Sequence, residues 1–215
     1  MKKVLAFYGA FNPPTNAHIA LAKLAMDQGG YEGVVFVPSK GDYIVDEQKK
    51  EYAFTNDFRL EMLSDLALAR PWMSVSRHDM DQEEQPRTYE SLCALKEEGY
   101  EPSLLIGTDV LERMETEWLN ADKIAEEFGI VCLKRGSFTE DIIQESDFLS
   151  AIRQYITLIQ TPAEYEMTSS TGARCQYDQA LRYWKGLCRI VPPEVSALLM
   201  KDFADVLLSG GTHET

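Results

Sequence analysis

The sequence lacks three features that would each indicate a different class of protein. No run of residues approaches the ~18 consecutive apolar residues of a membrane-spanning helix, so we expect no membrane as a partner. The cysteines, Cys93, Cys132, Cys175 and Cys188, are widely spaced without a CxxC pair, which favours neither a disulfide frame nor a zinc site. Lys2-Lys3 is not followed by an apolar stretch with a cleavage site, so we expect a cytoplasmic protein.

Basic residues are also scarce. The chain has 21 Lys and Arg residues against 35 Asp and Glu residues, which gives a net charge of −14. Nucleic acids and anionic membranes bind to basic faces, so this balance argues against both as main partners. If the substrates are nucleotides, the few basic residues and helix termini near the site must overcome an unfavourable overall field.

Several common catalytic patterns are absent as well. The P-loop pattern GxxxxGK[ST] does not occur, and no Ser/His/Asp or Cys/His nucleophile arrangement is visible. The acidic segments 79–84 and 112–117 do not have the spacing of metal ligands, so we predict no metal ligands from the protein itself.

What is present is an alternation of short apolar runs with helical patterns. For 215 residues, 45% of them hydrophobic and 26% charged, this alternation predicts one α/β domain with a parallel, doubly wound sheet and a helical C-terminal part. We expect a single domain at 1–208 and a flexible tail at 209–215. Strands are expected at 4–8, 34–37, 73–76, 103–106, 130–133 and 156–159. Helices are expected at 16–29, 58–66, 88–95, after 107–109, at 124–128, 170–184 and 193–207, with a helical or loop-rich segment at 142–155 and polar loops at 38–52 and 79–87.

Residues 9–18, Gly-Ala-Phe-Asn-Pro-Pro-Thr-Asn-Ala-His, lie between the first expected strand and the first expected helix. Gly9 permits close backbone approach, and Pro13-Pro14 rigidify the loop. Thr15 or Asn16 can cap the helix. The result is a helix N-terminus at the carboxyl end of a strand, which is an anion site, and His18 in the first turn can face the same anion.

This block resembles the (H/T)xGH signature of the nucleotidyltransferase superfamily. Its Gly-x-Phe-Asn-Pro portion is similar to the nicotinate/nicotinamide mononucleotide adenylyltransferases in particular. Thr15 stands where many bacterial members carry His, and Ala17 replaces the usual Gly. The resemblance implies a Rossmann-like nucleotidyltransferase fold.

A second block, Thr-Ser-Ser-Thr-Gly-Ala-Arg at 168–174, resembles the family's ISSTxxR signature. Ser170 and Thr171 can cap a helix whose N–H groups hold phosphate, and Arg174 can donate bidentate hydrogen bonds to phosphate oxygens. The structural alternative is a plain N-cap with a surface arginine. Together the two blocks favour a triphosphate site, provided that they meet across one cleft.

Other segments resemble the family's ligand contacts, and each has a structural alternative. Gly107 and Asp109 follow a strand, where Asp109 can accept hydrogen bonds from ribose hydroxyls or simply cap a helix. Trp118 can stack on the pyridine ring or belong to the core. Thr88, in a segment that resembles the family's Pro-x-Tyr-Thr, is a candidate contact to the pyridine base.

Basic residues at two places are candidates for binding phosphate. The stretches Lys40-Gly41-Asp42-Tyr43 and Lys49-Lys50 resemble the family's lysine-bearing loop, although a solvated charge run is the alternative. Lys134-Arg135 follows a strand where the family often has Arg, and one of the two is expected to meet phosphate.

The resemblance implies transfer of AMP from ATP to nicotinate or nicotinamide mononucleotide, with Mg²⁺ carried by the nucleotide. The catalytic residues that it implies are His18, Thr15 and Arg174. The implied ATP contacts are Gly9, Ala10, Phe11, His18, Gly107, Asp109, Ser170, Thr171 and Arg174, and the implied acceptor contacts are Asn12, Lys49, Thr88, Trp118 and Lys134. Two alternatives stay open: a related adenylyl- or cytidylyltransferase with another acceptor, and a nucleotide-binding regulator without turnover. A homo-oligomer is also possible.

Overall fold

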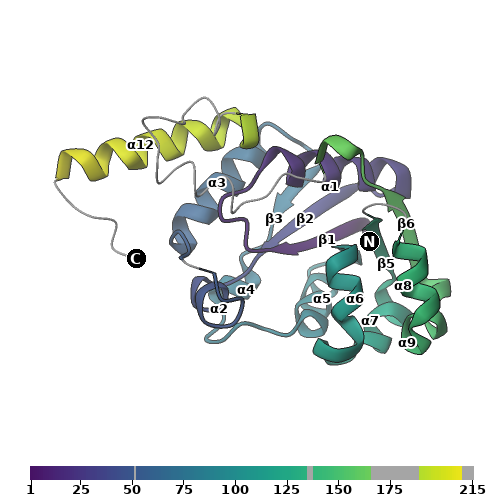
Figure 1. Cartoon of the computed structure of the whole chain (residues 1–215). Helices are drawn as coiled ribbons and strands as arrows, with labels where there is room; N and C mark the ends of the chain where they lie inside the picture. Colours follow the sequence, from purple (N-terminus) through teal and green to yellow (C-terminus); the bar gives the residue numbers. More distant parts are fainter. Residues whose placement is uncertain (51, 135–137, 166–188, 210–215) are drawn as a thin grey trace.

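A six-stranded parallel sheet forms the centre of the protein (Figure 1). The computed structural model describes residues 1–50, 52–134, 138–165 and 189–209. The strand order is β3-β2-β1-β4-β5-β6, and every neighbouring pair is parallel. The strands are β1 (Lys2–Gly9), β2 (Gly33–Pro38), β3 (Met73–Val75), β4 (Tyr100–Gly107), β5 (Ile130–Lys134) and β6 (Ile156–Gln160). This doubly wound order confirms the predicted fold class. The strand order reverses between β1 and β4, and this switch point is where such sheets bind ligands.

Helices cover both faces of the sheet. They are α1 (Asn16–Gly29), α2 (Gly41–Asp46), α3 (Asn56–Leu68), α4 (His78–Asp81), α5 (Thr88–Glu97), α6 (Thr108–Glu117), α7 (Ala121–Phe128), α8 (Thr139–Glu145), α9 (Asp147–Ala151) and α12 (Pro193–Ser209), with the 3₁₀ turns η1 (Arg153–Tyr155) and η2 (Ala163–Tyr165). Figure 1 shows α1, α3 and α12 on one side of the sheet and α5 to α9 on the other.

The strands are apolar on both faces because both faces are covered. In β1, Leu5 packs with the core that includes α1, α3 and α12, whereas Val4 and Ala6 pack with the core under α5, α6 and α7. All three are fully buried. Continuous apolar runs of this kind are typical of buried parallel strands, and they explain why the strands could be predicted.

Two expected loops contain short helices. The predicted loop at 38–52 includes α2, and the predicted loop at 79–87 overlaps α4. In α2 only Ile44 is buried, whereas Tyr43 and Val45 are exposed, so its sequence has no helical apolar periodicity. The segment 142–155 divides into α8, α9 and η1. The expected helix at 170–184 and most of the expected tail lie outside the described residues.

The C-terminal helix α12 packs against α3. Val195 and Leu199 are buried in the same core as Leu63 and Leu66 of α3. Arg70 and Glu194 form an ion pair at 3.1 Å beside this contact. The C-terminal end of α12 extends beyond the rest of the molecule (Figure 1). Among the helices in the described ranges, none is long and apolar enough to cross a membrane.

Candidate active site

Thr15 and His18 form a reciprocal cap at the start of α1. The Thr15 hydroxyl oxygen accepts from the backbone N–H of His18 at 3.4 Å, and the backbone N–H of Thr15 donates to Nδ1 of His18 at 2.9 Å. Thr15 is therefore the N-cap, one of the two residues that the sequence offered. A backbone N–H can only donate, so Nδ1 is an acceptor and the neutral imidazole carries its proton on Nε2.

The end of α1 that carries this cap suits an anion. It lies after the carboxyl end of the central strand β1, and its first turn contains no acidic residue. The N-terminal N–H groups and the helix dipole then favour a negative group at this position. The helix start therefore lies where the sequence predicted it, and the binding of an anion there stays a prediction.

Phe11 gives the loop between β1 and α1 its shape. Its φ of 42° lies in the left-handed region, which is strained for a bulky residue. The ring is 1% exposed and packs with Phe36 and His18, with ring centroids 5.2 Å apart in both pairs. A Cβ at Gly9 would lie 3.2 Å from this ring, which explains the glycine. Because the ring is buried, only the backbone of Phe11 can contact ATP as predicted.

Asn12 joins the loop to a distant segment. Its side chain is fully buried, donates to the carbonyl oxygen of Tyr52 at 2.8 Å and accepts from the backbone N–H of Phe54 at 2.8 Å. Both functions of the amide therefore hold the protein backbone. This placement favours a structural role over the acceptor contact predicted from the sequence.

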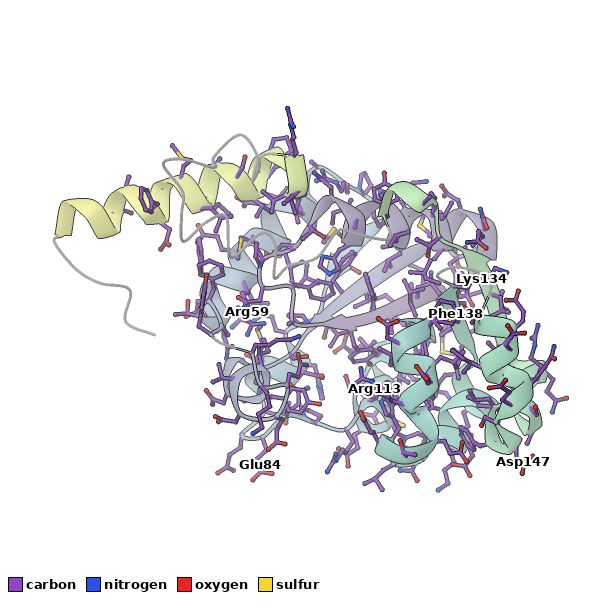
Figure 2. All side chains as sticks on the ribbon, in the orientation of Figure 1. Arg59, Glu84, Arg113, Lys134, Phe138 and Asp147 are labelled. Atoms are coloured by element: carbon purple, nitrogen blue, oxygen red, sulfur yellow. The ribbon has the colours of Figure 1, made fainter. Side chains whose placement is uncertain are left out.

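Arg59, which the sequence reasoning did not single out, contacts the same loop from α3 (Figure 2). It projects from α3, is 0% exposed and donates to the carbonyl oxygen of Ala10 at 2.8 Å. Burial lowers the pKa of its guanidinium to about 10, so the group stays charged at neutral pH. Nothing in the apolar pattern of α3 marks this arginine, because its contact to Ala10 spans 49 residues.

A cavity of about 720 Å³ lies between α2, the start of α5 and the turn after α6. It brings together Thr88 and Trp118, the two residues predicted to meet the pyridine ring. The residues that line it are Lys40, Asp42, Tyr43, Asp46, Glu47, Glu83, Glu84, Gln85, Pro86, Arg87, Thr88, Glu117, Trp118 and Leu119. Thr88 is the first residue of α5, as the expected start of this helix at residue 88 predicts, and Arg87 is its N-cap. Acidic residues outnumber basic ones in the lining, where Lys40 and Arg87 are the two cations.

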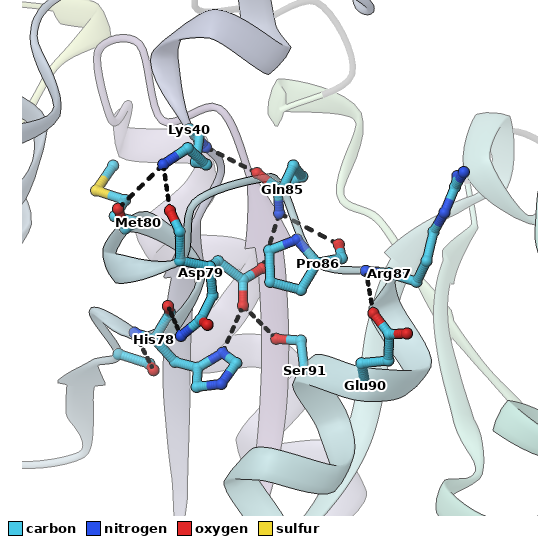
Figure 3. A network of polar contacts seen from close by, with 11 residues as sticks. Lys40, His78, Asp79, Met80, Gln85, Pro86, Arg87, Glu90 and Ser91 are labelled. Atoms are coloured by element: carbon cyan, nitrogen blue, oxygen red, sulfur yellow. Dashed lines mark hydrogen bonds and ion pairs between the residues drawn. The ribbon is translucent and has the colours of Figure 1, made fainter.

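A buried polar network fixes the wall of this cavity (Figure 3). Asp79, 1% exposed, accepts from the Ser91 hydroxyl at 2.6 Å and from Nε2 of Gln85 at 2.9 Å. Oε1 of Gln85 in turn accepts from the backbone N–H of Lys40 at 2.8 Å. The ammonium group of Lys40 donates to the backbone oxygen of Gln82 at 2.6 Å. Burial raises the pKa of the nearby Tyr8 phenol, with the charge of Asp79 as a smaller cause.

Comparison with known proteins identifies the family. The model of the cytidylyltransferase-like family matches residues 6–176. The chain belongs to this family. Its relatives include the nicotinate-nucleotide adenylyltransferase of Bacillus subtilis (strain 168), with 27% identity over 64% of this chain and 72% of the relative. The probable nicotinate-nucleotide adenylyltransferase of Desulfotalea psychrophila is 28% identical over 94% of this chain and 98% of the relative. The resemblance stated from residues 9–18 is thereby confirmed.

A solved structure of the same fold is the Plasmodium falciparum nicotinic acid mononucleotide adenylyltransferase complexed with NaAD. It superposes with a TM-score of 0.69 at 17% identity, covering 94% of this chain and 96% of that chain. This similarity supports the Rossmann-like nucleotidyltransferase fold.

The other residues predicted from the family occupy several different positions. Gly107 is the N-cap of α6, and Asp109 lies exposed in the first turn, with its carbonyl oxygen accepting from Nε of Arg113 at 3.0 Å. Lys134 ends β5 and pairs with Glu140. Lys49 is exposed, donates to the carbonyl oxygen of Asp46 and does not line the cavity.

The family's second signature, with Ser170, Thr171 and Arg174, lies outside the described residues, as does Arg135. The expected meeting of the two signatures therefore stays a prediction. Within the described ranges, no group of three or more His, Cys, Asp or Glu side chains could hold a metal ion.

Proposed function

We propose that this protein transfers the AMP part of ATP to the 5′-phosphate of nicotinate or nicotinamide mononucleotide and releases pyrophosphate. The observation that carries the proposal is the reciprocal cap of Thr15 and His18, which presents a helix N-terminus and an Nε2 proton at the carboxyl end of β1. We assign the pyridine ring to the cavity that Thr88 and Trp118 line, and the shared lining of these two residues supports this assignment. The two adenylyltransferase relatives from Bacillus subtilis and Desulfotalea psychrophila support the same reaction. We place the reaction in the cytoplasm.

The reaction needs no covalent intermediate. An oxygen of the acceptor phosphate forms a bond to the α-phosphorus of ATP, the bond from that phosphorus to the bridging oxygen breaks, and both electrons leave with pyrophosphate. A phosphate monoester is already a nucleophile, so the protein contributes positioning and charge stabilisation. We assign the Nε2–H of His18 and the N-terminus of α1 to the charge that develops on the α-phosphate and the departing pyrophosphate.

Two further contributions follow from the family resemblance. Arg174, with Ser170 and Thr171, is proposed to hold the β- and γ-phosphates. Mg²⁺ supplies charge neutralisation when it binds with ATP, carried by phosphate oxygens and water. Hydrogen bonds to ribose are assigned to Asp109, which lies exposed at the start of α6.

A panel of acceptors tests the proposal. Pyrophosphate release is measured with ATP or CTP and with nicotinate mononucleotide, nicotinamide mononucleotide and pantetheine phosphate, using wild-type protein and His18→Ala. We expect release with ATP and a pyridine mononucleotide, reduced ~10²–10³-fold in His18→Ala. Release only with CTP or only with pantetheine phosphate would favour a related transferase instead. ATP binding without release with any acceptor would indicate a regulator.

A further inference from the structure

Arg59 is a buried cation whose hydrogen bonds to the described residues all end on neutral oxygens. Nε donates to the carbonyl oxygen of Phe54 at 3.1 Å, one terminal nitrogen to that of Ala10 at 2.8 Å, and the other to Oδ1 of Asn56 at 2.6 Å. No carboxylate in the described part of the chain pairs with it. A buried charge without a counter-ion is unfavourable for stability, so its presence calls for a further explanation.

The bond to Ala10 acts on one particular peptide group. The carbonyl of Ala10 and the N–H of Phe11 belong to the same trans peptide, so they point in opposite directions. An acceptor bond at the carbonyl also strengthens the N–H as a donor. Among the described residues, none accepts a hydrogen bond from the N–H of Phe11. The strained φ of Phe11 and its packed ring fix the orientation of this peptide.

We propose that Arg59 is a positioning residue for ATP. It holds the Ala10–Phe11 peptide so that the N–H of Phe11 donates to the phosphates. Its charge, which no carboxylate of the described residues pairs, adds positive potential beside the loop. In a chain with a net charge of −14, a buried cation is screened less than a surface one and offsets the overall field locally. The inference rests on the proposed function. Because Arg59 is fully buried, it acts on ATP through the loop.

Asn56 allows the charge to be tested without moving the loop. Its Oδ1 accepts from Arg59 and also from the backbone N–H of Gly41 at 2.9 Å. Asn56→Asp keeps this oxygen and both hydrogen bonds but places a carboxylate against the guanidinium. We expect the affinity for a non-hydrolysable ATP analogue to fall about tenfold, the order expected for one unit charge acting through protein. The thermal unfolding midpoint should stay the same or rise, because the buried charge gains a partner.

Thr55→Asp is the matched control. Thr55 is the exposed N-cap of α3, and its hydroxyl accepts from the backbone N–H of Phe58 at 3.3 Å. Asp is an equally good N-cap, so this variant adds the same charge one residue away without pairing with Arg59. We expect its affinity for the ATP analogue to stay within about twofold of the wild type. Arg59→Lys keeps the positive charge but loses the planar guanidinium with its several N–H donors. It should retain more affinity for the ATP analogue than Arg59→Met.

The experiment measures the affinity for the ATP analogue by calorimetry, the KM of the mononucleotide and the unfolding midpoint for each variant. Weaker ATP binding in Asn56→Asp alone, with an unchanged or higher unfolding midpoint and an unchanged KM of the mononucleotide, supports the proposal. Equal ATP binding in Asn56→Asp and Thr55→Asp, or a loss of affinity matched by a loss of stability, overturns it. A wild-type chain that binds no ATP would overturn the proposed function and this inference together.

Discussion

Nδ1 of His18 lies 2.9 Å from both the backbone nitrogen and the hydroxyl oxygen of Thr15. The side chain of His18 therefore has two separable parts: Nδ1 belongs to the helix cap, and Nε2 carries the proton proposed to act on phosphate. Substitutions that imitate one nitrogen or the other can distinguish the structural part from the catalytic part.

His18→Asn should lose turnover while keeping the fold. The side-chain oxygen of Asn can accept from the N–H of Thr15 as Nδ1 does, but the shorter side chain has no group at the position of Nε2. We expect kcat to fall ~10²–10³-fold and the unfolding midpoint to stay nearly unchanged. His18→Gln, whose amide can imitate Nε2–H, should recover part of kcat. Steady-state pyrophosphate release measures kcat, and thermal unfolding measures the stability of each variant. Normal turnover in His18→Asn would remove Nε2 from the mechanism.

Thr15→Ala should reduce stability through the loss of the N-cap. Its hydroxyl oxygen accepts from the backbone N–H of His18, and removing such a cap costs ~1 kcal/mol. Thr15→Ser retains the hydroxyl and should recover most of the loss. Urea unfolding of the three proteins measures the difference. If Thr15→Ser were as unstable as Thr15→Ala, the methyl group in this buried position, rather than the cap, would be the stabilising part.

Trp118 should report acceptor binding by its fluorescence. It lines the cavity with Thr88, where a pyridine ring can stack on it. We expect the mononucleotide to quench the fluorescence of the wild type and of Trp72→Phe, which alters a tryptophan in a separate core. Trp118→Phe should remove this quenching, and Trp118→Ala should raise the KM of the mononucleotide about tenfold, since stacking on an aromatic ring contributes ~1–3 kcal/mol. Quenching that persists in Trp118→Phe would place the ring elsewhere.

The sequence was sufficient to predict the elements whose residues are apolar on a regular period. The six strands and the cap at Thr15 follow from local patterns, and so do Thr88 and Trp118 as residues of one cavity, through the resemblance to a family. The short helices α2 and α4 were missed because each buries too few apolar residues to show a period.

The side chains that hold the loop between β1 and α1 by hydrogen bonds to distant segments could not be predicted in the same way. Asn12 reaches Tyr52 and Phe54, and Arg59 reaches Ala10, across 40 or more residues of chain. A polar side chain carries no local signal of such a partner, because an Asn in a loop and an Arg on a helix are ordinary surface residues in most sequences. Asn12 was predicted as an acceptor contact from its motif, whereas its burial and hydrogen bonds favour a structural role.

The hydrogen bond from the Gln85 amide to the Asp79 carboxylate can be tested for its effect on the acceptor cavity. Asp79→Asn can place an amide N–H₂ against that of Gln85, and a buried donor without an acceptor costs ~1–3 kcal/mol. We expect a lower unfolding midpoint and a several-fold higher KM for the mononucleotide, with the KM of ATP unchanged.

The double variant Asp79→Asn/Gln85→Glu reverses the donor and the acceptor. Oδ1 of Asn can still accept from Ser91, and Glu can still accept from the N–H of Lys40, so both contacts of the network survive. Stability and the KM of the mononucleotide should therefore recover together, which a double-mutant cycle measures as a coupling energy. If stability recovers but the KM stays high, the network supports the fold without setting the geometry of the cavity. Recovery of both would show that the wall formed by Gln85 and Thr88 depends on the bond to Asp79.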